Sequence, residues 1–162
     1  MYQFAYFLGI GVAFIIWGLL FLTRRDLRKE QIFISLLSTL LGPISQIFWF
    51  SDTYWRPEYL FPIKIFGVFV GVEEALFGFV TGGIGSVVYE AVFRKKASYG
   101  IKRTKFSILL FLAGALGFVL LAALGLNPIW ASSVALFFTA LVMIAVDRNL
   151  KLDMLLSGIL ML

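Results

Sequence analysis

The sequence contains no cysteine and no histidine. Without cysteine the chain can form no disulfide, no haem thioether and no thiolate metal site, and without histidine it lacks the usual ligands of zinc and iron. We therefore expect neither a metal nor a cofactor. Charged residues are scarce as well, at 14% of the chain against about 25% in an average soluble domain. Because 61% of the 162 residues are hydrophobic, the composition predicts a membrane protein with several spans.

The apolar runs show helical rather than alternating patterns, and a membrane-spanning helix satisfies its own backbone polar groups. We therefore predict an all-α fold, a polytopic transmembrane helix bundle with five full spans. The predicted spans are residues 3–23, 31–50, 63–93, 106–126 and 129–146. A sixth apolar segment, residues 152–162, is too short to cross, so it is either a half-inserted tail or a helix that is cut short. No long polar linker divides residues 1–162, which we treat as a single domain.

The basic residues indicate the orientation of the spans. Twelve of the 14 lysines and arginines lie in three segments, residues 24–30, 94–105 and 147–151, and the other two are Arg56 and Lys64. Cytoplasmic loops are enriched in Lys and Arg, so we predict these three segments inside and the N-terminus outside. The same rule accounts for the net charge of +5, and we expect no nucleic-acid partner.

Two adjacent carboxylates, Glu73 and Glu74, interrupt the third apolar run. A charged side chain at the centre of a bilayer costs about 2.5–3.5 kcal/mol or more, so it is rarely accidental. On one helix over residues 63–93 the pair would lie about three turns in, roughly 15 Å deep. Glu74 would share a face with five glycines, and Glu73 would point about 100° away, towards a cavity or the lipid. The glycines, which we expect to pack closely against another helix, are Gly67, Gly71, Gly78, Gly82 and Gly85.

The glutamate pair allows three interpretations from the residues alone. Two neighbouring carboxyl groups in a low dielectric cannot both ionise cheaply, so we expect at least one to hold a proton and the two to titrate together. Such a pair can donate a proton to an apolar substrate, relay protons in a transporter, or donate a structural hydrogen bond to Gln46 or Ser38. The loop before the third run is rich in Trp and Tyr, which is typical of an interfacial belt or of a lid over an apolar substrate.

Three segments carry a resemblance to a known family. They are Tyr54-Trp-Arg-Pro-Glu-Tyr-Leu-Phe, Gly71-Val-Glu-Glu-Ala-Leu-Phe-Gly-Phe and Tyr89-Glu-Ala. Together they resemble the lycopene cyclase domain, the family of the small integral-membrane cyclase subunits of bacteria and archaea and of the cyclase part of fungal fusion enzymes. The family hallmark is Pro-x-Glu-Glu followed by a Phe-rich run, and this chain has Gly71 where the family has proline. The resemblance covers about residues 20–93.

The resemblance implies a membrane enzyme that cyclises the linear ends of lycopene by acid–base chemistry, without net redox change, in the cytoplasmic membrane of a prokaryote. It makes Glu73 and Glu74 the catalytic residues. The side chains expected to bind the isoprenoid, with π faces towards positive charge, are Phe66, Phe69, Phe77, Phe79, Tyr54 and Trp55. The expected partners are membrane lipids, the apolar isoprenoid and a second cyclase-like subunit, identical or different. The alternative is a non-catalytic membrane protein, a transporter or a partner-binding subunit, that keeps the cyclase-like fold.

Overall fold

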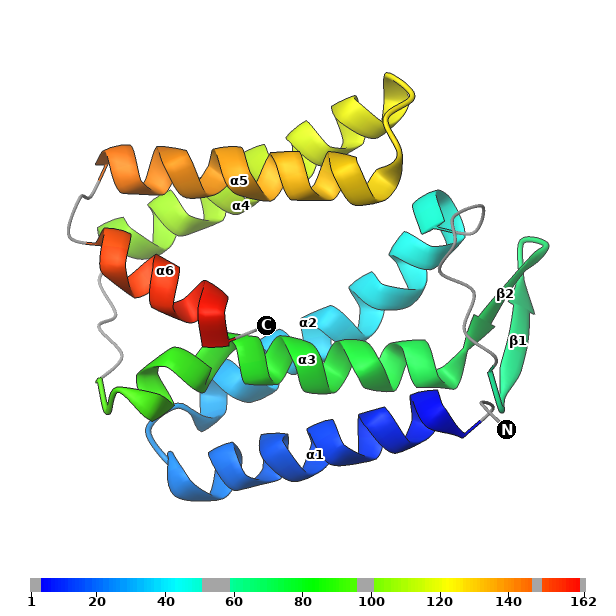
Figure 1. The fold of residues 1–162 in the computed structure, drawn as a ribbon, viewed down its shortest axis with the longest axis horizontal. Helices are drawn as coiled ribbons and strands as arrows, with labels where there is room; N and C mark the ends of the chain where they lie inside the picture. The colour runs from blue at the N-terminus through cyan, green and yellow to red at the C-terminus, as the bar shows by residue number, and fades with distance from the viewer. Residues whose placement is uncertain (1–3, 51–58, 96–100, 147–149, 161–162) are drawn as a thin grey trace. The chain divides into compact units, whose positions relative to one another are not determined.

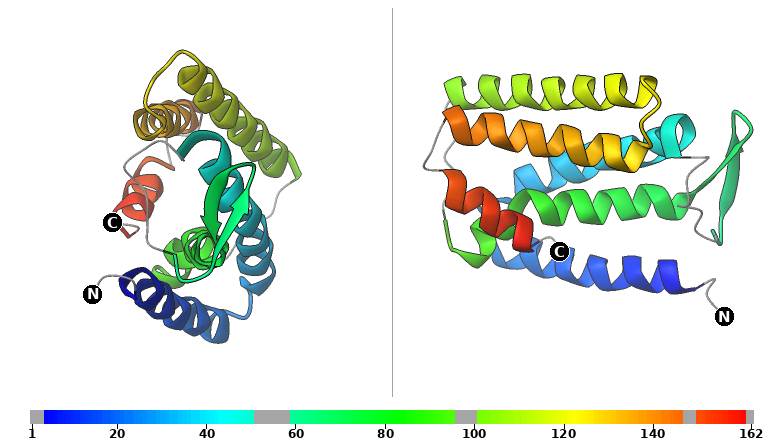
Figure 2. Two further views of the ribbon diagram at one scale, coloured as in Figure 1. Left: turned by 90° about the vertical axis from the view of Figure 1, so that its right-hand side faces the viewer. Right: turned by 45° about the horizontal axis from the view of Figure 1, so that its top comes forward.

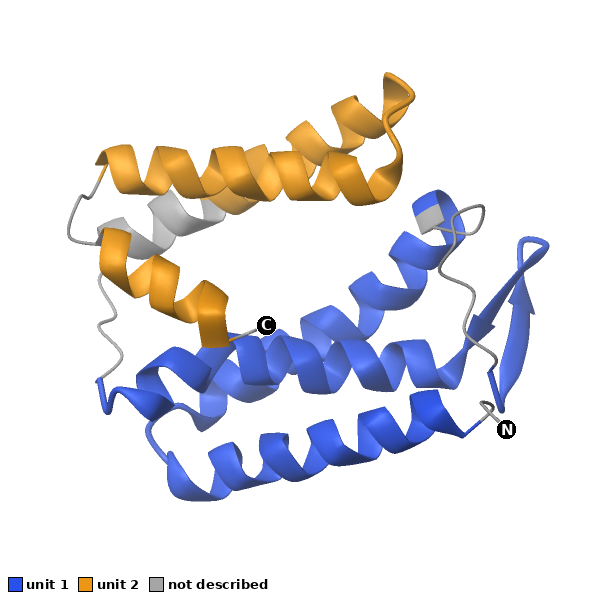
Figure 3. Cartoon of the chain, in the orientation of Figure 1, with its two compact units in different colours: residues 1–97 blue, residues 98–162 orange. Residues whose placement is uncertain are grey.

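The computed structural model describes residues 4–50, 59–95, 101–146 and 150–160. Contacts between residues divide the chain into two compact units, residues 1–97 and 98–162, where the sequence analysis treats it as one domain (Figure 3). Unit 1 contains α1 (Ala5–Thr23), α2 (Arg28–Ser45), the π-helix η1 (Gln46–Phe50), β1 (Pro62–Ile65), β2 (Val68–Gly71) and α3 (Val72–Val92). Unit 2 contains α4 (Ile101–Ala123), α5 (Pro128–Val146) and α6 (Leu150–Leu160).

Within unit 1, α3 packs against both α1 and α2 (Figures 1 and 2). Helices α1 and α3 run in the same direction, and α2 runs in the opposite direction. The contact between α2 and α3 is close because small residues form it. A Cβ on Gly78 would overlap the backbone carbonyl oxygen of Ser38, and a Cβ on Gly82 would overlap the Ser38 side chain. Small residues at such a crossing let two backbones approach, which is how helices associate in lipid.

Aromatic and polar side chains join α1 to its two neighbours. The Trp17 ring packs on Phe79 of α3, with ring centroids 5.2 Å apart. Its indole N–H donates to the Ser35 hydroxyl of α2 at 2.9 Å, and the Gln31 amide of α2 donates to the Trp17 carbonyl at 2.9 Å. Helix α3 passes this polar pair at Gly83, where any Cβ would overlap Trp17 and Ser35. Gly83, which the sequence analysis does not select, therefore lies where all three helices meet.

The third span begins at Val72, so the predicted helix from Ile63 is wrong. Residues before Val72 form the antiparallel hairpin β1–β2, in which Ile65 pairs with Val68. The two residues between the strands, Phe66 and Gly67, have φ angles of 49° and 87°. Two successive residues with positive φ make the tight turn whose twist matches that of paired strands. Alternating β-branched residues after Pro62 favour strands over a helix in this segment.

The hairpin also breaks up the predicted face of five glycines. Gly67 lies in the hairpin turn and Gly71 ends β2, so neither belongs to α3. Gly85 does lie on α3, but it is exposed within unit 1. The glycines that bring α3 close to α2 are Gly78 and Gly82.

In unit 2, α4 and α5 form a helical hairpin with a tight connection. Gly125 has a φ of 88°, the left-handed conformation that commonly ends a helix. The Asn127 side-chain oxygen accepts the Ile129 N–H at 3.0 Å, so Asn127 caps α5, and Pro128 takes the first helical position. Small residues again form the helix contact: a Cβ on Gly114 would lie 2.7 Å from the Thr139 hydroxyl oxygen.

Among the described residues, four helices are long and apolar enough to cross a membrane. They are Ala5–Thr23, Arg28–Trp49, Val72–Val92 and Pro128–Val146. In α4 the apolar part, Leu109–Ala123, is shorter. Large apolar side chains cover the outside of α1, where Leu8, Ile15 and Leu22 are 65%, 65% and 66% exposed. Outward-facing apolar side chains on spanning-length helices are typical of a protein surrounded by lipid, which agrees with the predicted membrane class.

Candidate acidic site at the start of helix α3

Glu73 and Glu74 lie in the first turn of α3. Gly71 takes the N-cap position with extended backbone angles, and Val72 is the first helical residue. The predicted position three turns inside a longer helix is therefore wrong, because β2 occupies the residues that those turns require. Both carboxylates are buried, with exposed fractions of 1% for Glu73 and 7% for Glu74. Unpaired N–H groups and the helix dipole favour negative charge at a helix N-terminus, so this position stabilises a carboxylate.

Glu73 binds the backbone of the segment that leads into the hairpin. Its Oε1 atom accepts the N–H groups of Leu60 and Phe61 at 2.6 and 3.1 Å. Its Oε2 atom is buried and has no hydrogen-bond partner among the described residues. The part of the prediction that places Glu73 against the lipid is therefore wrong: the side chain faces inwards and binds the backbone of residues 60 and 61.

Glu74 lies beside a tyrosine hydroxyl. The Tyr59 hydroxyl is 3.5 Å from Oε2 of Glu74, the outer limit of a hydrogen bond. Burial raises the pKa of Tyr59 above its ordinary value, and the negative charge of Glu74 adds to the effect. Tyr59 therefore remains a neutral hydrogen-bond donor at physiological pH. The backbone carbonyl of Glu74 packs against Gly42 of α2, where a Cβ would lie 3.2 Å from its oxygen.

Aromatic rings from three segments surround the two carboxylates. The Tyr6 ring of α1 lies edge-on to Tyr59, with centroids 6.4 Å apart, and 5.7 Å from the Phe77 ring of α3. The Tyr6 phenol lies within electrostatic range of both glutamates. Neither tyrosine is among the site residues predicted from the sequence. The sequence does mark both residues. Tyr6 places a hydroxyl group within the apolar run of α1, and Tyr59 belongs to the loop rich in Trp and Tyr.

Of the aromatic residues predicted to bind substrate, Phe77 lies beside the glutamates. Phe66 is at the tip of the hairpin and 89% exposed, and Phe69 on β2 is 58% exposed, so both lie on the surface of the hairpin. Phe79 packs against Phe14 and Trp17 of α1 instead. Tyr54 and Trp55 lie outside the described residues.

Gly71 is fitted closely to both sides of the site. A Cβ at this position would overlap the Tyr59 ring and lie 2.6 Å from Oε2 of Glu73. Only glycine lets the Tyr59 ring and the Glu73 carboxylate both pack against the chain here. A proline at this position would bring its ring into the same space.

The start of α3 brings together four side chains that carry oxygen atoms. Two buried carboxyl groups and two half-buried phenols lie near one another, and one carboxylate oxygen has no partner among the described residues. No group of three or more acidic residues in the described part of the chain could hold a metal ion. Comparison of the chain with protein-family models, with curated proteins and with solved structures finds no match.

Proposed function

We propose that this chain is a lycopene-cyclase-like integral membrane protein that acts on a long apolar isoprenoid by acid–base cyclisation without net redox change. The observation that carries the proposal is the buried pair Glu73 and Glu74, adjacent in the first turn of α3 and lined by Tyr6, Tyr59 and Phe77. The resemblance of the segments around this pair to the lycopene cyclase domain supports the choice of substrate class.

The site favours one negative charge over two. The start of α3 and the N–H groups that Leu60 and Phe61 donate to Glu73 stabilise one carboxylate. A second carboxylate beside it, in a setting with little water, would be repelled by the first. We therefore propose that one of the two carboxyl groups holds a proton.

In the proposed reaction one proton passes from the pair to the isoprenoid, and a different proton returns from the product to the pair. One carboxyl group protonates a terminal carbon–carbon double bond of the isoprenoid, which leaves a tertiary carbocation and a carboxylate. The π electrons of a nearby double bond attack the cation and close the ring, so the positive charge moves to a ring carbon. Negative charge and the π faces of Tyr6, Tyr59 and Phe77 stabilise the cation. Loss of a proton from a neighbouring carbon to the carboxylate forms the new double bond and restores the pair.

We also propose five spans with the N-terminus outside, in the cytoplasmic membrane of a prokaryote. In unit 1, Arg24 and Lys95 lie together at one end, where α1 and α3 finish, and the glutamate pair lies at the other end. The positive-inside rule assigns the basic end to the cytoplasm, which puts the acidic site near the outer leaflet. Since the chain has no cysteine, Lys64→Cys and Lys95→Cys would report on each side through an impermeant thiol reagent on intact cells. If the reagent labelled Lys95→Cys and not Lys64→Cys, the orientation would be the opposite of the one proposed.

One observation favours a second function. The two backbone hydrogen bonds of Glu73 hold Leu60 and Phe61 in place, a structural task that requires no reaction. Under this alternative the chain is a non-catalytic membrane protein, a transporter or a partner-binding subunit. The two functions differ in what a charge-removing substitution changes: catalysis fails under the first, and only the segment around residues 60 and 61 changes under the second.

Expression in a lycopene-accumulating bacterium tests the proposal. The chain would be produced alone and together with a second cyclase-like subunit, and the pigments would be separated by chromatography. We expect cyclic products from the wild type and unchanged lycopene from Glu73→Gln and Glu74→Gln. Glu90→Gln is the matched control, because it removes a carboxylate from the other end of the same helix. Unchanged lycopene in every well-expressed combination would favour the non-catalytic alternative.

A further inference from the structure

A cavity of about 880 Å³ lies between the end of α1 and the end of α3, at the far end of unit 1 from the glutamate pair. Its volume falls within the range of about 300–1,000 Å³ that is usual for small-molecule sites. Leu20 and Val92 give it an apolar wall within the two helices, and Arg24, Asp26 and Arg94 give it a charged rim just beyond their ends. The cavity is therefore apolar on the side of the spanning helices and ionic beyond them.

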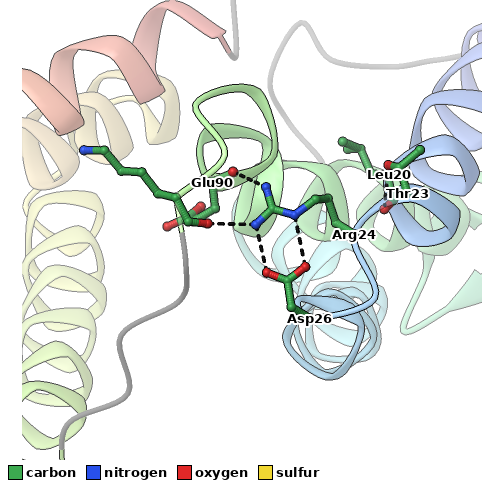
Figure 4. A network of polar contacts seen from close by, with 6 residues as sticks. Leu20, Thr23, Arg24, Asp26 and Glu90 are labelled. Carbon is green, nitrogen blue, oxygen red and sulfur yellow. Dashed lines mark hydrogen bonds and ion pairs between the residues drawn. The ribbon is translucent and has the colours of Figure 1, made fainter.

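Arg24 builds the rigid side of the rim (Figure 4). Its guanidinium group forms a bidentate ion pair with Asp26, through Nε at 3.0 Å and Nη2 at 2.8 Å. It also donates to the backbone carbonyls of Glu90 and Lys95. These bonds use four of its five N–H donors and join the end of α1 to the end of α3. Asp26 balances its charge, so Arg94 supplies the net positive charge of the three ionic side chains that line the cavity.

Arg94 is held in an unusual backbone conformation. Its φ angle of 51° lies in the left-handed region, directly after the end of α3. Glycine is the usual residue where a helix ends in this way, because any side chain is disfavoured there. An arginine at a position that suits glycine, with its side chain exposed at the mouth of a cavity, indicates that the guanidinium group itself is needed.

We propose that this cavity binds the phosphate group of an anionic phospholipid from the cytoplasmic leaflet. Arg94 binds the phosphate as a forked donor, the remaining N–H of Arg24 adds a second contact, and an acyl chain lies along Leu20 and Val92. The single net positive charge matches one phosphodiester. The cavity lies at the basic ends of two spanning-length helices, where the proposed orientation puts the anionic headgroups of the inner leaflet, and this place favours a lipid over a free phosphate. The site is separate from the glutamate pair and does not depend on its chemistry.

Lipid retention measured by native mass spectrometry tests the site. The protein would be purified in mixed micelles with equal amounts of phosphatidylglycerol and phosphatidylcholine, and the bound lipids compared. Arg94→Gly removes the guanidinium group while suiting the φ angle, so it should leave the thermal unfolding midpoint unchanged or raised. Arg94→Gln is the second variant, and Arg25→Gln is the matched control, because Arg25 is exposed nearby and does not line the cavity.

We expect the wild type and Arg25→Gln to retain phosphatidylglycerol in preference to phosphatidylcholine, and both Arg94 variants to lose that preference by about tenfold, as for a lost charge-assisted hydrogen bond. Excess inorganic phosphate should not displace the lipid, because it lacks the acyl chain. If Arg25→Gln lost the preference for phosphatidylglycerol as much as the Arg94 variants do, the lipid would be attracted to the basic end of unit 1 in general. That result would overturn the proposed site. Displacement of phosphatidylglycerol by inorganic phosphate alone would show that the cavity binds free phosphate. That result would overturn the proposal that it binds a lipid.

Discussion

Gly78 of α3 crosses Ser38 of α2 so closely that a Cβ on the glycine would overlap the serine carbonyl oxygen. The obstacle is backbone, which cannot rotate away as a side chain can. The two helices can therefore approach this closely only because residue 78 has no Cβ atom.

Gly78→Ala should destabilise the protein by about 1–3 kcal/mol, because the added methyl group must push two packed backbones apart. Thermal unfolding in detergent, followed by circular dichroism, would measure the change. Gly18→Ala is the matched control: it is also a helical glycine, with open space around its Cβ position. It should be neutral or stabilising by up to about 1 kcal/mol, through helix propensity. Equal midpoints for the two variants would contradict the close crossing.

Glu73→Ala should release the segment that Glu73 holds. The N–H groups of Leu60 and Phe61 would lose their acceptor, and a typical intramolecular hydrogen bond contributes about 0.5–1.5 kcal/mol to stability. Hydrogen exchange resolved to single amides should show loss of protection at residues 60 and 61. Glu74→Ala is the control, and it should leave these two amides protected. Retained protection in Glu73→Ala would contradict the observed hydrogen bonds.

Tyr59 should make the stability of the fold fall at high pH. Its pKa is raised by burial and by Glu74 above the ordinary value of 10.0, so the unfolded chain releases this proton at a lower pH than the folded chain does. The stabilisation is therefore fully present below about pH 10 and is lost as the pH rises further. Unfolding midpoints measured from neutral pH to above pH 10 should fall more steeply for the wild type than for Tyr59→Phe. Parallel curves would contradict a buried, neutral phenol.

The sequence predicts the spans better than it predicts the site. The runs that become α1 and α5 are long and carry no charged residue, and a helix satisfies their backbone in lipid. The run from Ile63 to Gly71 is apolar too, but a short apolar run suits a strand as well as a helix. Lys64 and the Phe66-Gly67 pair are the local signals of the hairpin. Without the hairpin, the glutamates appear deep in a helix rather than at its start.

The surroundings of the glutamates depend on contacts between distant parts of the chain. Tyr6 comes from α1, more than sixty residues before Glu74, and helical spacing within one segment cannot reveal such a neighbour. The closeness of Gly71 to Tyr59 likewise follows from the fold of the hairpin. The identity of the acidic pair is readable in the sequence because two charges in an apolar run are costly. The groups that bind each carboxylate appear only in three dimensions.

The most direct test of the proposed acid–base role is the mass of the product formed in heavy water. Membranes that contain the protein would be exchanged into heavy water, supplied with lycopene made in ordinary water, and the extracted pigments analysed by mass spectrometry. Because the carboxyl proton of the pair exchanges with solvent, the account predicts that the wild type forms a cyclic product with one deuterium for each ring. It predicts no cyclic product from Glu74→Gln. Cyclic product without deuterium, or lycopene recovered unchanged from the wild type, would contradict the account.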